Sequence, residues 1–213
     1  MTHRIIPFGF LFLLIVSLPL GALAEDAFSE GVAYARIVPA QPTAEPGKIE
    51  VVELFWYGCP HCHRFQPYLE RWLKNKPDDV VYIRMPAILS DSWALLARAY
   101  YAAEALGKLE EIHQPLFKAI HEQKRRFSTE RDVAAFFAEH GVSAEDFRKV
   151  FHSFSVESKV RRARQMTRRY HTQGTPTVVI NGKYRSDPGM SRGFDNLIRV
   201  IDFLVEQERR ARG

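Results

Sequence analysis

Phe55-Trp56-Tyr57-Gly58-Cys59-Pro60-His61-Cys62 is the stretch from which the fold can be read, and it holds the only two cysteines of the 213-residue chain. The run that leads into it, from Ile49 to Trp56, consists of β-branched and aromatic residues almost without alternation. Such a run is typical of a buried strand. After Cys62, apolar residues recur at spacings of three and four, which predicts a helix to about Lys76. The two thiols are therefore expected where a buried strand meets the N-terminus of a helix.

A cysteine at a helix N-terminus is chemically reactive. The first backbone N–H groups of a helix have no partner within it, and the peptide dipoles favour negative charge there. Cys59 is expected at this point, with Pro60 in the first turn, where a missing N–H costs nothing. His61 could add to the stabilisation of a Cys59 thiolate. Because a stabilised thiolate favours the reduced form, the disulfide would be a strong oxidant.

Three other interpretations of the cysteine pair are considered. The stretch from Cys59 to His63 matches the C-x-x-C-H pattern of c-type haem attachment, but covalent haem needs an accessible loop and a pocket. A zinc site would use Cys59, Cys62 and distant histidines, yet no second tight pair of ligands is visible in the sequence. An inert disulfide would not explain the position between strand and helix.

The N-terminal residues 1–24 have the features of a secretory signal peptide. His3 and Arg4 form a basic start, residues 8–20 an apolar core, and residues 22–24 an A-x-A site that predicts cleavage after Ala24. An uncleaved membrane anchor is the alternative. Exported proteins meet an oxidising compartment, where cysteines usually form structural disulfides. A bridge across so short a loop removes little entropy, so the pair is expected to serve chemistry.

The rest of the chain predicts one α/β domain that is interrupted by helices. An edge strand is expected at Ala33–Val38 and a second apolar strand at Val80–Met85, the latter parallel to the strand before the cysteines. Four or five amphipathic helices follow, enough for a small bundle. A strand at Thr177–Ile180, a hairpin at Asn181-Gly182 and a helix from about Ser191 to Arg209 close the chain. The expected division is 25–89 and 172–213 for the α/β domain and 90–171 for the inserted all-helical domain.

A second motif, Gly174-Thr175-Pro176-Thr177, places a proline directly before the strand at Thr177. Taken alone, it could be an ordinary proline at the start of a strand. Together with Cys-Pro-His-Cys, it makes the sequence resemble the DsbA family of periplasmic disulfide oxidoreductases, which have a thioredoxin-like fold. The likeness extends over essentially the whole chain after residue 24.

The resemblance implies a role for each residue of the two motifs. Cys59 would be the exposed nucleophile and Cys62 the buried resolving thiol. Pro176 would be cis and lie against the disulfide, while the backbone of Thr175 would align an extended substrate segment. His61 would destabilise the oxidised form.

A charged residue in the strand before the cysteines is a further candidate for the site. Glu53 lies within the apolar strand before Cys59, where a carboxylate is costly. It either points into solvent at a sheet edge or, as the resemblance suggests, forms a buried acid under the disulfide, with Arg84 as a candidate partner.

The net charge of +5 does not indicate nucleic-acid binding. The arginines between residues 161 and 169 are expected to form the solvated side of a helix.

The sequence thus predicts a monomeric thiol–disulfide oxidase without a cofactor. It would donate a Cys59–Cys62 disulfide to newly exported, cysteine-containing proteins, and a membrane quinone reductase like DsbB would reoxidise it. The alternatives are a reductase or isomerase of the same fold and, from another class, a c-type haem electron carrier.

Overall fold

The structure is a computed structural model that describes residue 2 and residues 28–212. The predicted signal peptide and its cleavage after Ala24 fall, apart from Thr2, outside the described residues. Within the described part, no helix is both long enough and apolar enough to span a bilayer.

A five-stranded sheet in the order β1-β5-β4-β2-β3 forms the centre of the molecule. The strands are β1 (Ala35–Arg36), β2 (Ile49–Phe55), β3 (Val80–Pro86), β4 (Thr177–Ile180) and β5 (Tyr184–Ser186). As predicted, β2 and β3 are parallel, and the other pairs are antiparallel. The edge strand β1 is shorter than the predicted Ala33–Val38, because its partner β5 is itself only three residues long.

The turn between β4 and β5 confirms the predicted hairpin. Asn181 and Gly182 both have a positive φ, of 51° and 66°, as the tight hairpin turn favoured by Asn-Gly requires. At Gly182 a side chain is also excluded by space, since a Cβ atom would lie 2.0 Å from the carbonyl oxygen of Gln41.

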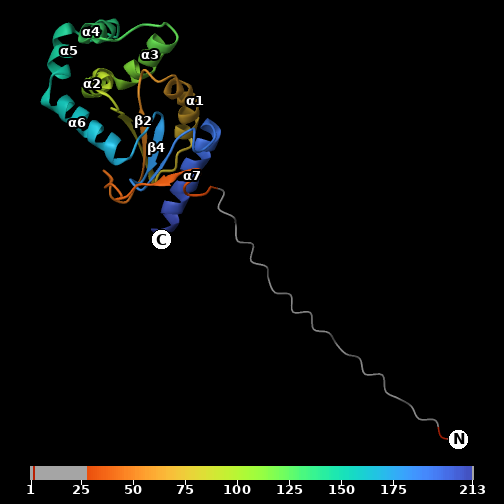
Figure 1. Cartoon of the computed structure of the whole chain (residues 1–213). Coiled ribbons are helices and arrows are strands. Elements are labelled where there is room, and N and C mark those ends of the chain that lie inside the picture. Colours follow the sequence, from red (N-terminus) through yellow and green to blue (C-terminus); the bar gives the residue numbers. More distant parts are fainter. Residues whose placement is uncertain (1, 3–27, 213) are drawn as a thin grey trace.

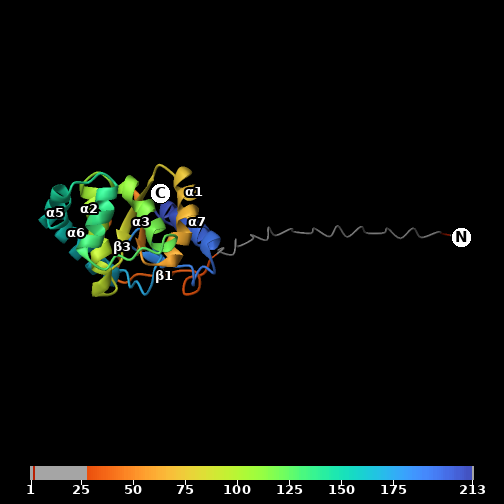
Figure 2. The same ribbon diagram turned by 90° about the horizontal axis from the view of Figure 1, so that it is seen from above.

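Helices cover both faces of the sheet. The bounds are α1 (Pro60–Lys74), α2 (Ala94–Ala105), α3 (Leu109–His121), α4 (Glu130–Glu139), α5 (Ala144–Phe151), α6 (Phe154–Arg169) and α7 (Phe194–Arg210), with a 3₁₀ turn at Asp91–Trp93. Figures 1 and 2 show α1 and α7 on one side of the sheet and α2, α5 and α6 on the other. The helices predicted between residues 90 and 171 are therefore present, in the predicted order.

Capping residues explain where several helices begin. Thr129 caps α4 in a capping box with Asp132, and Ser143 caps α5. The last helix begins at Phe194, later than the predicted Ser191. Ser191 belongs to the preceding turn instead, where its N–H and its hydroxyl both donate to the carbonyl of Asp187.

Two apolar clusters hold the layers together. One packs β2 and β4 against α1 and α7, and includes Val51, Leu69 and Ile201. The other packs the opposite face of β2, through Val52 and Leu54, against the inserted helices. The inserted helices therefore share their core with the sheet, whereas the sequence suggests a bundle of their own. The domain boundaries at 89/90 and 171/172 remain predictions.

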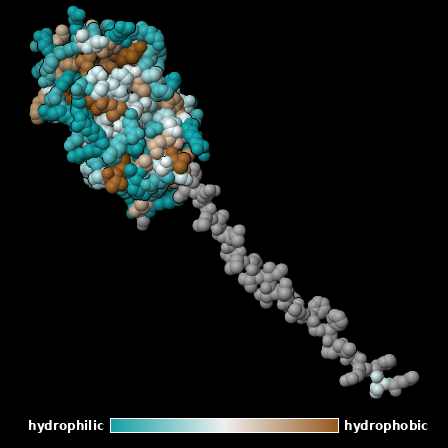
Figure 3. Space-filling view, viewed as in Figure 1, coloured by the Kyte–Doolittle hydropathy of each residue, from teal (hydrophilic) through white to brown (hydrophobic). Residues whose placement is uncertain are grey.

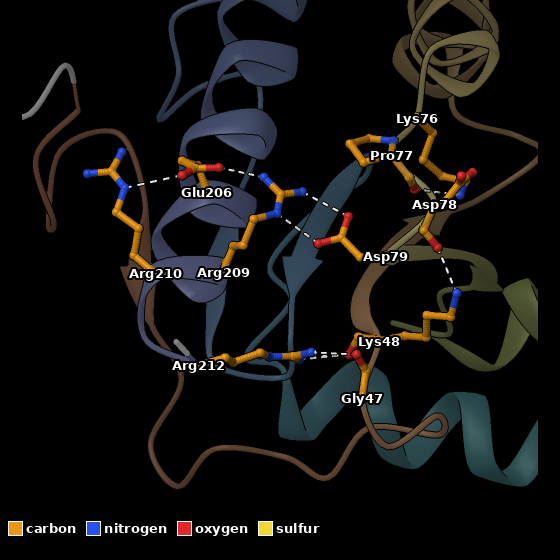
Figure 4. A network of polar contacts seen from close by, with 10 residues as sticks. All are labelled: Gly47, Lys48, Lys76, Pro77, Asp78, Asp79, Glu206, Arg209, Arg210 and Arg212. Atoms are coloured by element: carbon orange, nitrogen blue, oxygen red, sulfur yellow. Dashed lines mark hydrogen bonds and ion pairs between the residues drawn. The ribbon is translucent and has the colours of Figure 1, made fainter.

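A polar network ties the end of α7 to the turns before β2 and β3 (Figure 4). Arg209 donates two hydrogen bonds of 2.8 Å to the carboxylate of Asp79, and Glu206 accepts from the same guanidinium. Arg212 donates to the carbonyls of Gly47 and Lys48. These contacts lie at the start of β2, which is the opposite end of the strand from the cysteines.

Candidate active site

Cys59 is the N-cap residue of α1, as the sequence predicts. Its backbone is extended, with φ −87° and ψ 117°, and Pro60 is the first residue of the helix. Its N–H donates to the carbonyl of Trp56 at 3.0 Å, and its carbonyl accepts the N–H of His63 at 3.2 Å. The end of β2 and the first turn of α1 therefore hold the thiol in place.

The two thiols differ in their surroundings. Cys59 is expected to be exposed, but its exposed fraction is only 8%, because Thr175 lies over it, with the Thr175 carbonyl oxygen 3.1 Å from Sγ. Cys62 is fully buried on the inner side of α1. Both cysteines are free thiols in this structure. The small exposed surface of Cys59 is therefore the only part of the pair that an incoming sulfur can reach directly.

The pKa values of the two thiols are shifted in opposite directions. The pKa of Cys59 is lowered from 9.0 to about 5, first by a hydrogen bond from the Cys62 thiol and further by Thr175 and by the backbone N–H groups of Cys62 and His61. Burial opposes this shift. The pKa of Cys62 is raised well above its usual value, first by burial and then by the proximity of Cys59 and Glu53. At neutral pH the reduced site therefore holds a thiolate at Cys59 and a thiol at Cys62.

We expect the alkylation rate of reduced protein to follow the Cys59 thiolate, with a midpoint near pH 5. In a Cys62→Ala variant the midpoint should rise, because the largest stabilising hydrogen bond is lost. The measurement is the rate of iodoacetamide labelling as a function of pH. A wild-type midpoint near the ordinary value of about 8.5 would contradict the assignment. Because folding lowers the pKa of Cys59, ionisation of this thiol stabilises the folded, reduced protein. This contribution is complete above the pKa of Cys59 in the unfolded chain and is lost as the pH falls through about 5.

The second motif lies beside Cys59, as the resemblance implies. The Thr175–Pro176 peptide bond is cis, as expected. His61 and Pro176 line one crevice, together with residues 173–175 and 187–189. His61 is exposed, and its Nδ1 lies 3.0 Å from the guanidinium of Arg64, which donates to it. The two motifs, 116 residues apart between Cys59 and Thr175, thus form the walls of one crevice.

Glu53 is buried, with no exposed surface, so the interpretation as a solvated residue at a sheet edge is wrong. It shares a face of β2 with Val51 and is directed toward α1. The predicted partner Arg84 has its Nε 4.0 Å from Oε2. Burial raises the pKa of Glu53, while its polar partners partly oppose that shift.

Two closer partners of Glu53 were missed from the sequence. The Tyr82 hydroxyl donates to Oε2 at 2.5 Å, and the Gln66 amide donates to Oε1 at 3.2 Å. The same Gln66 amide lies 3.4 Å from the carbonyl of Cys62, to which it also donates. Gln66 faces inward one turn after Cys62, so its spacing could have pointed to this link. Glu53 is thereby connected to the backbone of the buried cysteine.

Two histidines of α3 hold Tyr57, one at its side chain and one at its backbone. Its hydroxyl is 2.8 Å from Nδ1 of His113, and its carbonyl is 2.7 Å from Nε2 of His121. Both bonds fix the loop that precedes Cys59. No motif signals these contacts, because they join residues 56 and 64 positions apart.

The geometry of the site also bears on the haem and zinc interpretations of the cysteine pair. Complete burial of Cys62 leaves only one accessible thiol, whereas the C-x-x-C-H pattern attaches haem through two. His63 stacks on His121 and lies 3.4 Å from a carboxylate oxygen of Glu122. Within residues 28–212, no three histidine, cysteine or acidic side chains are grouped so that they could hold a metal ion.

Residue 58 has to be glycine because the Trp56 ring leaves no space for a side chain, and not because of a positive φ. A Cβ atom there would lie 2.5 Å from the ring of Trp56, which stacks on Trp93 with centroids 4.2 Å apart. The ring cannot retreat without losing that stack. A side chain at residue 58 would therefore disturb the loop that carries Cys59.

We accordingly expect Gly58→Ala to destabilise the fold by about 1–3 kcal/mol, the usual cost of overpacking. Gly174→Ala is the control, because a Cβ atom there meets nothing within 4 Å. Denaturant unfolding of both variants measures the difference. Equal stability of the two variants would show that the Trp56 ring moves freely.

Comparison with known proteins agrees with this architecture. The DSBA-like thioredoxin domain family matches residues 79–202. The thiol:disulfide interchange protein DsbA of Azotobacter vinelandii is 40% identical over 181 residues, which cover 85% of each chain. The protein of the same name from Pseudomonas aeruginosa is 36% identical over 190 residues, which cover 89% of this chain and 90% of that one.

Solved structures give the same result. The crystal structure of Pseudomonas aeruginosa DsbA superposes with a TM-score of 0.83 and 36% identity, covering 88% of this chain and 97% of that one. That of the oxidoreductase DsbA from Xylella fastidiosa has a TM-score of 0.78, also at 36% identity, with coverages of 84% and 96%. The predicted thioredoxin-like fold with inserted helices is confirmed. From its sequence and its fold, the chain belongs to the DSBA-like thioredoxin family.

Proposed function

We propose that this thiol–disulfide oxidoreductase acts as a dithiol oxidase, which donates a Cys59–Cys62 disulfide to cysteine-containing proteins. The observation that carries the proposal is the asymmetry of the two thiols. Cys59 keeps a small exposed surface and its pKa is lowered to about 5, whereas Cys62 has no exposed surface and its pKa is raised. A stable Cys59 thiolate favours the reduced form of the enzyme, and hence the transfer of the disulfide to a substrate.

The reaction proceeds in two exchanges. A substrate thiolate attacks Sγ of Cys59, a mixed disulfide forms, and the bond between Cys59 and Cys62 breaks. Cys62 leaves as a thiolate and takes up a proton, as its raised pKa requires. A second substrate thiolate then attacks the substrate sulfur of the mixed disulfide. Cys59 leaves as a thiolate, so the substrate loses two electrons and the enzyme gains them.

The residues around the cysteines have supporting roles in this proposal. Pro60 begins α1, so that the free N–H groups of the first helical turn face the thiolate. The backbone N–H of His61 helps to lower the pKa of Cys59. The resemblance to the family implies that the His61 side chain disfavours the oxidised form. Thr175 and Pro176 form the wall against which an extended substrate segment is aligned. Glu53 accepts or supplies the proton that Cys62 exchanges.

The proposed location is the periplasm, after removal of residues 1–24. The basic start, the apolar core and the A-x-A site support export. After each turnover the reduced enzyme has to lose two electrons, and a membrane quinone reductase of the DsbB kind is the proposed acceptor. The substrates are newly exported proteins whose cysteines are still reduced.

Two alternative functions differ from the oxidase, one in the direction of disulfide exchange and the other in the class of protein. A reductase or isomerase of the same fold would use the same cysteines, but the lowered pKa of Cys59 favours release of electrons by the substrate. A c-type haem carrier would need both thiols for attachment, and the burial of Cys62 opposes this. The oxidase is therefore the function that the geometry supports best.

Equilibrium titration of the cysteine couple against glutathione tests the direction. At pH 7 a shift of the Cys59 pKa from 9.0 to about 5 favours the reduced form by about 2.7 kcal/mol, which corresponds to roughly 60 mV. We expect a potential less negative than about −180 mV. A value near the about −270 mV of a thioredoxin would overturn the oxidase proposal. A His61→Leu variant should be more reducing than wild type if His61 disfavours the disulfide.

A further inference from the structure

Helix α6 carries the charge imbalance of the whole chain. It contains six basic residues and one acidic residue, a net charge of +5. The chain has 30 basic and 25 acidic residues, which is also +5, so the rest of the molecule holds 24 of each and is neutral. The excess of positive over negative charge in this protein is therefore located on one helix.

Five arginines of α6 lie on its outward side and are called here the α6 arginine face: Arg161, Arg162, Arg164, Arg168 and Arg169. At 100° per residue they span about 160° of the helix circumference. The opposite side, which includes Val156, Val160 and Ala163, is buried in the core. Figure 3 shows mainly hydrophilic residues over the flank of the molecule that α6 occupies in Figure 1. The prediction of a solvated basic face is confirmed.

Most of this charge is not neutralised within the protein. Arg164 pairs with Asp91 at 2.6 Å, and Arg161 lies 4.0 Å from Glu157, whose carboxylate also binds Arg98. The other three arginines of the face have no carboxylate within 4.0 Å among residues 28–212. The arginines instead line an open hollow with Ser158 and Gln165. The face is therefore available to an external anion.

Phe154 adds an apolar group to the same face. It is 80% exposed, more than any other large apolar side chain described. It lies two turns before Arg161 and four turns before Arg168, so the three share one line along the helix. The guanidinium of Arg161 lies 5.9 Å from its ring centroid. The other apolar side chains of α6 are buried in the core, so Phe154 is the one that can enter a membrane interface, where Phe commonly lies in membrane-surface helices.

We propose that the α6 arginine face, with Phe154, binds the surface of a bilayer that contains anionic phospholipids. The helix would lie along the surface, with its arginines on the phosphate groups and Phe154 at the boundary of the acyl chains. An acidic protein would match the arginines but would leave Phe154 without a role. The preference for lipid over nucleic acid rests on the export named under the proposed function, which places the protein beside membranes. It does not depend on the direction of disulfide exchange.

Co-sedimentation with vesicles tests the proposal, using protein purified after export. Binding is expected to vesicles of phosphatidylcholine with phosphatidylglycerol and not to phosphatidylcholine alone. It should weaken in about 0.5 M salt, where the Debye length falls to roughly 4 Å. Arg168→Glu with Arg169→Glu should lower the partition coefficient at least about 25-fold, since each basic residue beside an anionic surface contributes about fivefold. Phe154→Ser should lower it about tenfold, through partial loss of apolar burial.

Control variants match the α6 variants in the change of net charge and in the removal of an exposed apolar side chain. Lys74→Glu with Arg126→Glu makes the same change in net charge at exposed residues of other segments, and Val32→Ser removes another exposed apolar side chain. Each control should bind as wild type does, and all variants should keep their disulfide exchange rate, which separates this proposal from the oxidase. Equal binding by the α6 variant and its control, or equal binding to both kinds of vesicle, would overturn the proposal. Binding to polyglutamate or to DNA without binding to vesicles would overturn it in favour of another polyanion.

Discussion

Replacing Cys59 by serine is expected to lower disulfide transfer at least about a thousandfold, as for loss of a nucleophile that no neighbour can replace. Cys62 remains in this variant, but it is fully buried and its pKa is raised, so it offers neither access nor a thiolate. The measurement is the rate at which a reduced substrate protein gains its disulfides.

The complementary variant separates the roles of the two thiols. Cys62→Ser keeps the Cys59 thiolate, which attacks the disulfide of an oxidised substrate protein, so that one substrate sulfur leaves as a thiolate. Without Cys62 to displace the bound substrate, mixed disulfides at Cys59 should accumulate. They are detected by non-reducing electrophoresis and by mass spectrometry. If Cys59→Ser accumulated them as fast as Cys62→Ser, the assignment of Cys59 as the sulfur that bonds to substrate would be wrong.

Glu53→Gln has the second large expected effect, a fall of about 10- to 100-fold in the rate of exchange at neutral pH. Cys62 must take up a proton when it leaves the disulfide, and the buried Glu53 carboxyl, with its raised pKa, is able to hold one. Glutamine keeps the size and much of the hydrogen bonding with Tyr82 and Gln66 but cannot transfer a proton. The pH profile of exchange should therefore change in shape as well as in height.

A neighbouring glutamate supplies the control. Glu50 lies in the same strand and is also buried, but it is further from the cysteines and accepts the N–H of Ala44. Glu50→Gln replaces a buried carboxyl without touching Gln66 or Cys62, and its pH profile should match wild type. An unchanged profile in Glu53→Gln would rule out the proton-transfer role.

Much of the site could be predicted from short-range patterns. The run from Ile49 and the helical spacing after Cys62 place the thiols at a strand–helix junction, which the structure confirms. The hairpin at Asn181-Gly182 is recognisable because few residues adopt a positive φ. The start of α7 is harder to predict, because the turn before it depends on how Ser191 contacts Asp187.

Other parts of the site depend on residues that approach each other only in the folded chain. Tyr82 and Gln66 come from different elements, and the sequence contains no pattern that brings them to Glu53. The two histidines that hold Tyr57 are equally hidden. The degree of exposure of Cys59 likewise depends on the Thr175 loop, 116 residues away.

Residue spacing along the chain is enough to establish the position of the cysteine pair, the α/β class with inserted helices, and the basic side of the fifth inserted helix. Local geometry converts such spacing directly into a strand, a helix or a face. Packing of the layers, in contrast, determines which thiol carries the charge, what surrounds Glu53, and that Phe154 stays exposed among the arginines. These features depend on burial and on contacts between distant segments, and both exist only once the chain has folded.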